Sequence, residues 1–131
     1  MADILTFDRF VPGSTIGSAS EAVGEEALAR WRKMYPWDQP VPGRLPIAIC
    51  VPLMMRAYMK VVAPRPPGNI HARQEFTFVA PISEGENVTT EISCLNKELR
   101  RERRYLFLAV RSTGEGGRVL FTGRMDMIWA V

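Results

Sequence analysis

The sequence predicts a single α+β domain in which one curved antiparallel sheet of about five strands wraps around a long central helix. Three observations support this fold class. Residues 47–62 form an apolar stretch suited to a buried helix, and residues 70–129 alternate between apolar and polar side chains as strands do. The length of 131 residues is enough for one core without disulfides or metals. We therefore treat residues 1–131 as one domain.

The first third of the chain predicts a short strand and a helix. The segment up to about Ser18 reads as a loop with a strand at residues 14–16. From Ser20 the spacing becomes helical, and early acids favour a helix N-terminus; the apolar positions are Ala27, Leu28, Trp31 and Met34. We expect this helix to end near Tyr35, because the proline that follows disfavours the α conformation at the residue before it.

A proline-rich loop leads into the central helix. Residues 36–46 contain four prolines and one glycine, which is the chemistry of a shaped loop. Residues 47–62 are apolar on nearly every side, so we expect other elements to cover most faces of this helix. Pro52 fits best in the first helical turn, where its missing N–H costs little. The regular helix is therefore predicted to start between Ala48 and Val51.

The second half of the chain predicts strands. Along residues 70–79, alternation places Gln74, Phe76 and Phe78 on one face and His71 and Glu75 on the other. Further strands are predicted around residues 88–94, 105–111 and 118–129, with residues 112–117 as a hairpin connection. Since the turns are short, an antiparallel meander following the helix is the simplest topology.

Composition limits the classes of function. Hydrophobic residues make up 47% and charged residues 24% of the chain, which is typical of a globular protein. A net charge of +3 is too small to predict nucleic-acid binding by itself. Cys50 and Cys94 lack metal-binding or CxxC spacing and read as free thiols. The chain shows no secretory signal, and its longest apolar run is about half the roughly 20 residues of a membrane span. We therefore expect a cytoplasmic protein with no membrane partner.

Several segments resemble MaoC-like hot-dog proteins. The sequence GNIHARQEFTFVAPISEGENV at 68–88 resembles their second strand and the turn after it, with matching residues Phe76, Phe78, Pro81, Ile82, Gly85, Glu86 and Val88. Residues 43–55 and 123–129 resemble the approach to the central helix and the closing strand. The resemblance covers about residues 14–131. It implies a hot-dog fold, an acyl-CoA or acyl-carrier thioester as the substrate, no separate cofactor, and (R)-specific hydration of a 2-enoyl chain.

The sequence departs from this family at the catalytic motif. The hydratases that it resembles carry Asp-x-Asn-Pro-x-His before the central helix, whereas residues 37–42 here read WDQPVP. Aligning Pro40 with the motif proline places Trp37 and Pro42 at the acid and histidine positions. Neither side chain can transfer a proton, so the motif weakens the assignment as a hydratase while leaving the architecture in place.

Three residues are candidates for proton transfer. Asp38 is the carboxylate of the proline-rich loop; it is either a lone base or a turn-stabilising residue that bonds nearby backbone amides. His71, the one histidine of the chain, is either a catalyst or a solvated or dimer-interface residue. Glu75 is the strand carboxylate that a thioesterase could use.

The start of the central helix is the candidate substrate-binding site. We expect the unpaired N–H groups of Ala48, Ile49 and Cys50 to donate to a thioester carbonyl. Arg56, one of two charged residues in this helix, is a further candidate. The basic run at 98–104 lies where two strands should turn; it is either a solvated hairpin or a site for the phosphates of CoA.

Three hypotheses of function follow. The first is a thioester-binding subunit that is catalytically incomplete alone and acts in a homodimer or beside a different hot-dog subunit. The second is a hydratase or thioesterase whose chemistry has moved to Asp38, His71 or Glu75. The third is a non-enzymatic interaction module that uses its arginines. Dimerisation is expected because a single hot-dog subunit leaves a strand edge open.

Overall fold

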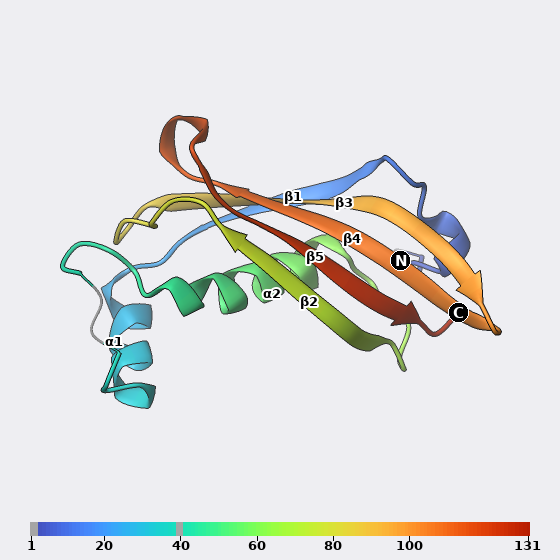
Figure 1. The fold of residues 1–131 in the computed structure, drawn as a ribbon, viewed down its shortest axis with the longest axis horizontal. Coiled ribbons are helices and arrows are strands. Elements are labelled where there is room, and N and C mark those ends of the chain that lie inside the picture. Colours follow the sequence, from blue (N-terminus) through green and yellow to red (C-terminus); the bar gives the residue numbers. More distant parts are fainter. Residues whose placement is uncertain (1–2, 39–40) are drawn as a thin grey trace.

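The computed structural model describes residues 3–38 and 41–131. A five-stranded antiparallel sheet curves over one long helix, and a shorter helix projects from one end of the molecule (Figure 1). In chain order the elements are β1 (Thr15–Ala22), α1 (Glu25–Met34), α2 (Cys50–Val61), β2 (Ile70–Phe78), β3 (Asn87–Arg100), β4 (Arg103–Thr113) and β5 (Val119–Trp129), with 3-10 turns at Phe7–Arg9, Ile47–Ile49 and Glu115–Gly117.

The strand order in the sheet is β1-β3-β4-β5-β2. Strands β3, β4 and β5 form the predicted meander, joined by two hairpins. The prediction is wrong for β2, which pairs with β5 at one edge of the sheet and not with β3. The segment 79–86 carries the chain past β5 and β4 to start β3, and β1 then closes the other edge by pairing with β3.

The N-terminal half differs from prediction at one boundary. Strand β1 runs to Ala22, so the strand is longer than expected and the helix begins at Glu25 instead of near Ser20. The end of α1 at Met34, just before the predicted limit, is confirmed. Helix α2 begins at Cys50 with Pro52 in its first turn, also as predicted.

The core lies between α2 and the concave face of the sheet. From α2 the buried side chains include Leu53, Met54 and Tyr58, and the strands contribute a large apolar set: Val88, Ile92, Leu106, Leu108, Val110, Phe121, Met125, Met127 and Trp129. The helix is less enclosed than predicted, because Val51 and Met59 remain exposed on the side away from the sheet.

A β-bulge changes the faces of β2. Residues directly opposite each other in an antiparallel pair share a face, and both His71 and Gln74 lie opposite buried methionines of β5, Met127 and Met125. The register shifts between His71 and Arg73, which reverses the alternation at that point. His71 therefore lies on the core face with Gln74, and the prediction that it shares a face with Glu75 is wrong.

Within residues 3–38 and 41–131, no helix is long and apolar enough to cross a membrane.

Candidate functional site

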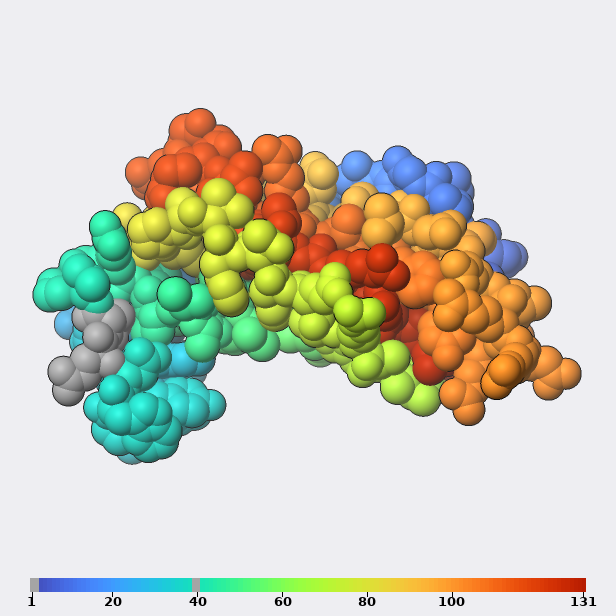
Figure 2. Space-filling model, viewed as in Figure 1, coloured from blue at the N-terminus to red at the C-terminus, as the bar shows by residue number. Residues whose placement is uncertain are grey.

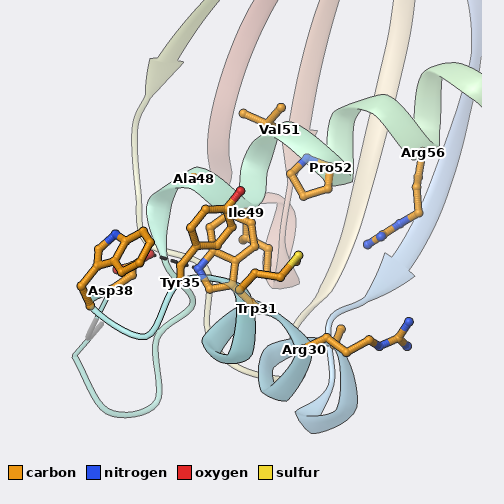
Figure 3. A pocket seen from close by; sticks show the side chains of 12 residues that line it. Arg30, Trp31, Tyr35, Asp38, Ala48, Ile49, Val51, Pro52 and Arg56 are labelled. Carbon is orange, nitrogen blue, oxygen red and sulfur yellow. Dashed lines mark hydrogen bonds between the residues drawn. The ribbon is translucent and has the colours of Figure 1, made fainter.

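A cleft of about 870 Å³ lies between α1 and the start of α2. In the space-filling view, α1 forms a lobe that stands away from the body of the molecule (Figure 2). Trp31 of α1 and Tyr35 just after it lie toward Ala48 and Ile49 at the start of α2 (Figure 3). The lining residues are Ala27, Arg30, Trp31, Met34, Tyr35, Trp37, Asp38, Ala48, Ile49, Val51, Pro52 and Arg56.

Aromatic rings form one wall of the cleft. Within α1 only Leu28 is buried, so most of this helix is free to face the cleft or solvent. The rings of Trp31 and Tyr35, one helical turn apart, have centroids 4.7 Å apart, and Tyr35 meets the edge of Trp37 at 5.9 Å. Such contacts add to the apolar burial of each ring. The wall is therefore broad, apolar and suited to a hydrocarbon ligand.

Asp38 is held against this wall. The Trp31 indole Nε1 donates a hydrogen bond of 3.0 Å to Oδ2 of Asp38, and the Asp38 N–H donates to the carbonyl of Tyr35. The sequence left two interpretations of Asp38 open, a base or a residue bonded to backbone amides. Its carboxylate instead accepts from an indole, which ties the turn to α1 and leaves the second carboxylate oxygen, Oδ1, without an intramolecular donor among the described residues.

The opposite wall comes from the start of α2. Ala48, Ile49, Val51 and Pro52 present aliphatic surface to the aromatic wall. At the far end, Nε of Arg56 donates to both carboxylate oxygens of Glu21 on β1, at 2.9 and 3.1 Å. The structure thus brings together four of the predicted site residues in one cleft: Asp38, Ala48, Ile49 and Arg56.

Cys50 does not join them. It lines a separate groove of about 300 Å³ with Ile47, Phe78 and Val79, and burial raises the pKa of its thiol to about 11. The expectation of free N–H groups here is also corrected. The N–H of Ile49 donates to Pro46 O, and that of Cys50 donates to Ile47 O, because the chain enters α2 through a 3-10 turn.

His71 and Glu75 also lie outside the cleft. Both are on β2 and exposed. Nε2 of His71 lies 3.0 Å from Oε1 of Gln74. Glu75 pairs with Arg73 and lies opposite Arg124 on the outer face of the sheet. Within one chain neither residue reaches the α1–α2 cleft.

Sequence reasoning missed the aromatic wall. From the sequence, Trp31 was one of the apolar positions of a helix and Tyr35 only the end of that helix; in the structure Trp31 packs against the core and also lines the cleft. The available signal was the spacing of three large aromatic residues, Trp31, Tyr35 and Trp37, next to a proline-rich loop. A helix whose largest side chains have no predicted partner element is a candidate ligand wall.

Few titratable side chains line the cleft. Asp38 is the one carboxylate among its described lining residues, and no histidine lines it. Of the three residues aligned above with the hydratase motif, Trp37 and Pro42 are exposed, and Pro40 lies outside the described residues. No group of three His, Cys, Asp or Glu side chains in residues 3–38 and 41–131 is arranged to hold a metal ion. The cleft therefore combines apolar walls with one carboxylate among its described lining residues.

Comparison with known proteins shows similarity in structure. No protein-family model and no curated protein matches the sequence. The MaoC-like dehydratase from Rhodospirillum rubrum superposes with a TM-score of 0.82 at 15% identity, covering 97% of this chain and 98% of that one. The (R)-hydratase from A. caviae involved in PHA biosynthesis gives 0.71 at 18% identity, covering 92% and 100%. A thioesterase from Thermus thermophilus, complexed with coenzyme A and Zn, gives 0.67 at 16% identity, covering 90% and 86%.

These similarities establish the fold. The chain has the hot-dog architecture of MaoC-like dehydratases and (R)-hydratases, with a curved five-stranded antiparallel sheet packed on one long helix. The predicted fold class and the resemblance to MaoC-like proteins are therefore confirmed at the level of architecture.

Proposed function

We propose that this protein binds acyl thioesters in the α1–α2 cleft and is a MaoC-like hot-dog subunit that cannot complete hydration or dehydration by itself. The observation that carries the proposal is a large apolar cleft with a single carboxylate, Asp38, and no imidazole among its described lining residues. Hydration of an enoyl chain needs a proton donor and a base placed together. One subunit supplies at most one of them here.

The size and walls of the cleft support an acyl ligand. Its volume of about 870 Å³ falls within the range of about 300–1,000 Å³ that is usual for small-molecule sites. The rings of Trp31, Tyr35 and Trp37 face the aliphatic side chains of α2, so a hydrocarbon chain between them would be shielded from water on both sides. The similar hydratase and thioesterase structures support the same ligand class.

The working unit is a dimer formed through β2. This strand is an open edge of the sheet, and its end carries the exposed apolar side chains of Phe78 and Val79. The other edge, β1, carries Ser18 and Ser20 and has no exposed large apolar side chain among its residues Thr15–Ala22, which favours solvent. Exposed Val51 and Met59 on α2 extend the apolar surface. The second subunit is another copy of this chain or a different hot-dog subunit.

Binding and turnover measured together test the proposal. Purified protein is titrated with crotonyl-CoA and longer enoyl-CoAs, and hydration is followed in the same samples. We expect saturable binding with no appreciable turnover. Robust hydration by the protein alone contradicts incompleteness, and absence of binding contradicts the proposal. As a paired control, Ala48→Trp should fill the cleft and abolish binding, whereas Ala29→Trp, on the exposed side of α1, should not.

A second candidate function follows from the position of Asp38. A carboxylate at the cleft wall could activate water to hydrolyse a thioester without an imidazole. Asp38→Asn keeps an oxygen to accept the Trp31 hydrogen bond but removes the base. If the protein is a thioesterase, this variant should bind acyl-CoA normally and lose hydrolysis; equal hydrolysis by both proteins eliminates this candidate.

A further inference from the structure

The rings of the aromatic wall leave much of their surface uncovered. The planes of Trp31 and Tyr35 are tilted by 44° and those of Tyr35 and Trp37 by 82°, so neither pair stacks face to face. Met34, Tyr35 and Trp37 are all exposed, and each of them lines the cleft. Large apolar side chains that gather at a surface mark a place where another apolar group binds. The wall therefore offers ring faces to a ligand.

The wall across the cleft begins with small side chains. Ala48, Pro52 and Arg56 line it at intervals of four residues, a spacing that places side chains on one face of a helix. Trp31 and Tyr35 lie toward the Ala48 end of this wall (Figure 3). A methyl group and a proline ring project little from the backbone, so the start of α2 presents a shallow surface of C–H groups to the aromatic rings.

A slot with these two walls favours a flat, rigid ligand over a flexible chain. An aromatic ligand meets the rings of the wall in offset-stacked or edge-to-face contacts, and its negative ring face attracts the C–H groups of α2. These contacts add to the gain from apolar burial. A straight alkyl chain obtains the burial alone, and it loses conformational freedom when a cleft of about 870 Å³ holds it in one shape.

We propose that the α1–α2 cleft selects aromatic acyl groups, with the ligand ring held between Tyr35 on one side and Ala48 and Pro52 on the other. This inference rests on the proposed function and names the substrate class of the same site. Tyr35 is the central ring of the wall, because its centroid lies 4.7 Å from that of Trp31 and 5.9 Å from that of Trp37. Saturated acyl groups of the same size enter the same cleft and bind more weakly.

Two ligands of matched size isolate the ring contact. Benzoyl-CoA and cyclohexanecarbonyl-CoA have the same number of carbon atoms, and each carries a single ring next to the thioester. Burial alone favours the saturated ring, because its additional hydrogens give it more apolar surface. We expect the wild-type protein to bind benzoyl-CoA about two- to tenfold more tightly in calorimetric titration, which is what aromatic pairs add beyond burial. Equal affinities, or tighter binding of the saturated ring, overturn the inference.

Variants of Tyr35 test whether the wall causes the preference. Tyr35 is exposed, so its replacement should leave the fold intact. Tyr35→Phe keeps the ring and should keep the preference for benzoyl-CoA, whereas Tyr35→Leu keeps apolar surface without a ring and should bind the two ligands about equally. Comparing the ratio of affinities between variants cancels other differences between the ligands. Tyr105→Leu, in the separate hollow at the β3–β4 turn, is the control and should retain the wild-type ratio. An unchanged ratio in Tyr35→Leu overturns the assignment to this wall.

A straight-chain ligand separates this inference from the proposed function. The acyl group of heptanoyl-CoA has as many carbon atoms as that of benzoyl-CoA. If heptanoyl-CoA binds as tightly as benzoyl-CoA or more tightly, the selection of rings is overturned and the proposed function stands. If the wild-type protein binds none of these acyl-CoAs, the proposed function fails as well. Ala48→Trp should abolish the binding of benzoyl-CoA, and binding that survives this change places the ring outside the cleft and overturns the inference.

Discussion

Trp31 and Asp38 are the pair of residues on which the shape of the cleft depends. Their hydrogen bond joins α1 to the turn that follows it, and the indole also packs on Tyr35. Helix α1 is attached to the core by Leu28, which is buried, and by Ala27 and Trp31, which are partly buried against it. The hydrogen bond adds the attachment of the turn to this helix, so the shape of the wall depends on the indole donor as well as on packing.

Replacing that donor gives a first prediction. Trp31→Phe keeps a ring but removes the N–H, and we expect a loss of about 0.5–1.5 kcal/mol in the free energy of unfolding, with weaker acyl-CoA binding. Urea denaturation and ligand titration measure the two effects. Trp37→Phe serves as the stability control, because Trp37 is 76% exposed. Unchanged stability and affinity in Trp31→Phe would show that the hydrogen bond does not organise the wall.

Glu86 is the buried carboxylate that joins two turns. It accepts hydrogen bonds from the N–H groups of Ser83 and Glu115 and forms an ion pair of 2.8 Å with Arg118. Burial by itself would raise its pKa, but these donors outweigh burial and hold the pKa below its ordinary value. A lowered carboxyl pKa stabilises the fold above the pKa of the unfolded chain, and this stabilisation is lost as the pH falls through the folded value.

Glu86→Gln should therefore destabilise the protein at neutral pH by about 1–3 kcal/mol. The difference from wild type should shrink as the pH falls below about 4.5, the ordinary value, because the carboxylate is then protonated in the unfolded wild-type chain, and it should vanish once the pH has fallen through the lowered pKa of the folded state. Chemical denaturation at several pH values measures this. Exposed Glu84→Gln is the matched control, and a stability difference that stays constant down to about pH 3, well below the ordinary carboxyl pKa, contradicts the account.

At the scale of elements, strand boundaries and faces depend on contacts between distant segments. Alternation in the sequence identified all four strands of the second half, and the proline in its first turn fixed the start of α2. The place of β2 beside β5 and the bulge that turns His71 to the core face were not predictable, because both arise from pairing with a strand far along the chain, as in the pair His71 and Met127. Local periodicity carries no information about which edge a strand will join.

The β3–β4 turn gives a prediction at this scale. With Arg101 and Glu102 both in the left-handed region, Arg101→Asn/Glu102→Gly should stabilise the protein by about 1–2 kcal/mol, since these residues suit the turn. Arg101→Val, with a branched side chain in the same conformation, should do the opposite. Thermal unfolding measures both. Stabilisation by valine or destabilisation by the Asn-Gly pair would show that the turn has another backbone geometry.

At the scale of the whole molecule, the open β2 edge and the exposed side of α2 argue for a second subunit. Val79 is 59% exposed at the end of that edge. We predict that Val79→Lys yields a folded monomer, whereas Val11→Lys, at an equally exposed position near the N-terminus, leaves the assembly intact. Sedimentation equilibrium distinguishes the two states. A Val79→Lys protein that sediments like wild type would show that β2 is not the contact.

The candidate site was partly predictable for a physical reason. Four of the predicted residues lie close to the start of α2 in the sequence or within this helix: Asp38, Ala48, Ile49 and Arg56. Formation of the helix is therefore enough to bring them near one another. The aromatic wall was not predictable, because it depends on how α1 leans away from the sheet. His71 and Glu75 looked suitable by residue type, but the sheet carries them to an edge and to the outer face.

The most direct test of the central claim is to locate the bound acyl chain. Wild-type protein is irradiated with an acyl-CoA that carries a photoreactive diazirine at the end of its chain, and the labelled residues are identified by mass spectrometry. The account predicts labelling of residues 27–38 or of the cleft-lining residues at the start of α2, which are Ala48, Ile49, Val51, Pro52 and Arg56, and this labelling should be suppressed in Ala48→Trp. Labelling of the Cys50 groove near Phe78, or labelling that persists in Ala48→Trp, would contradict it.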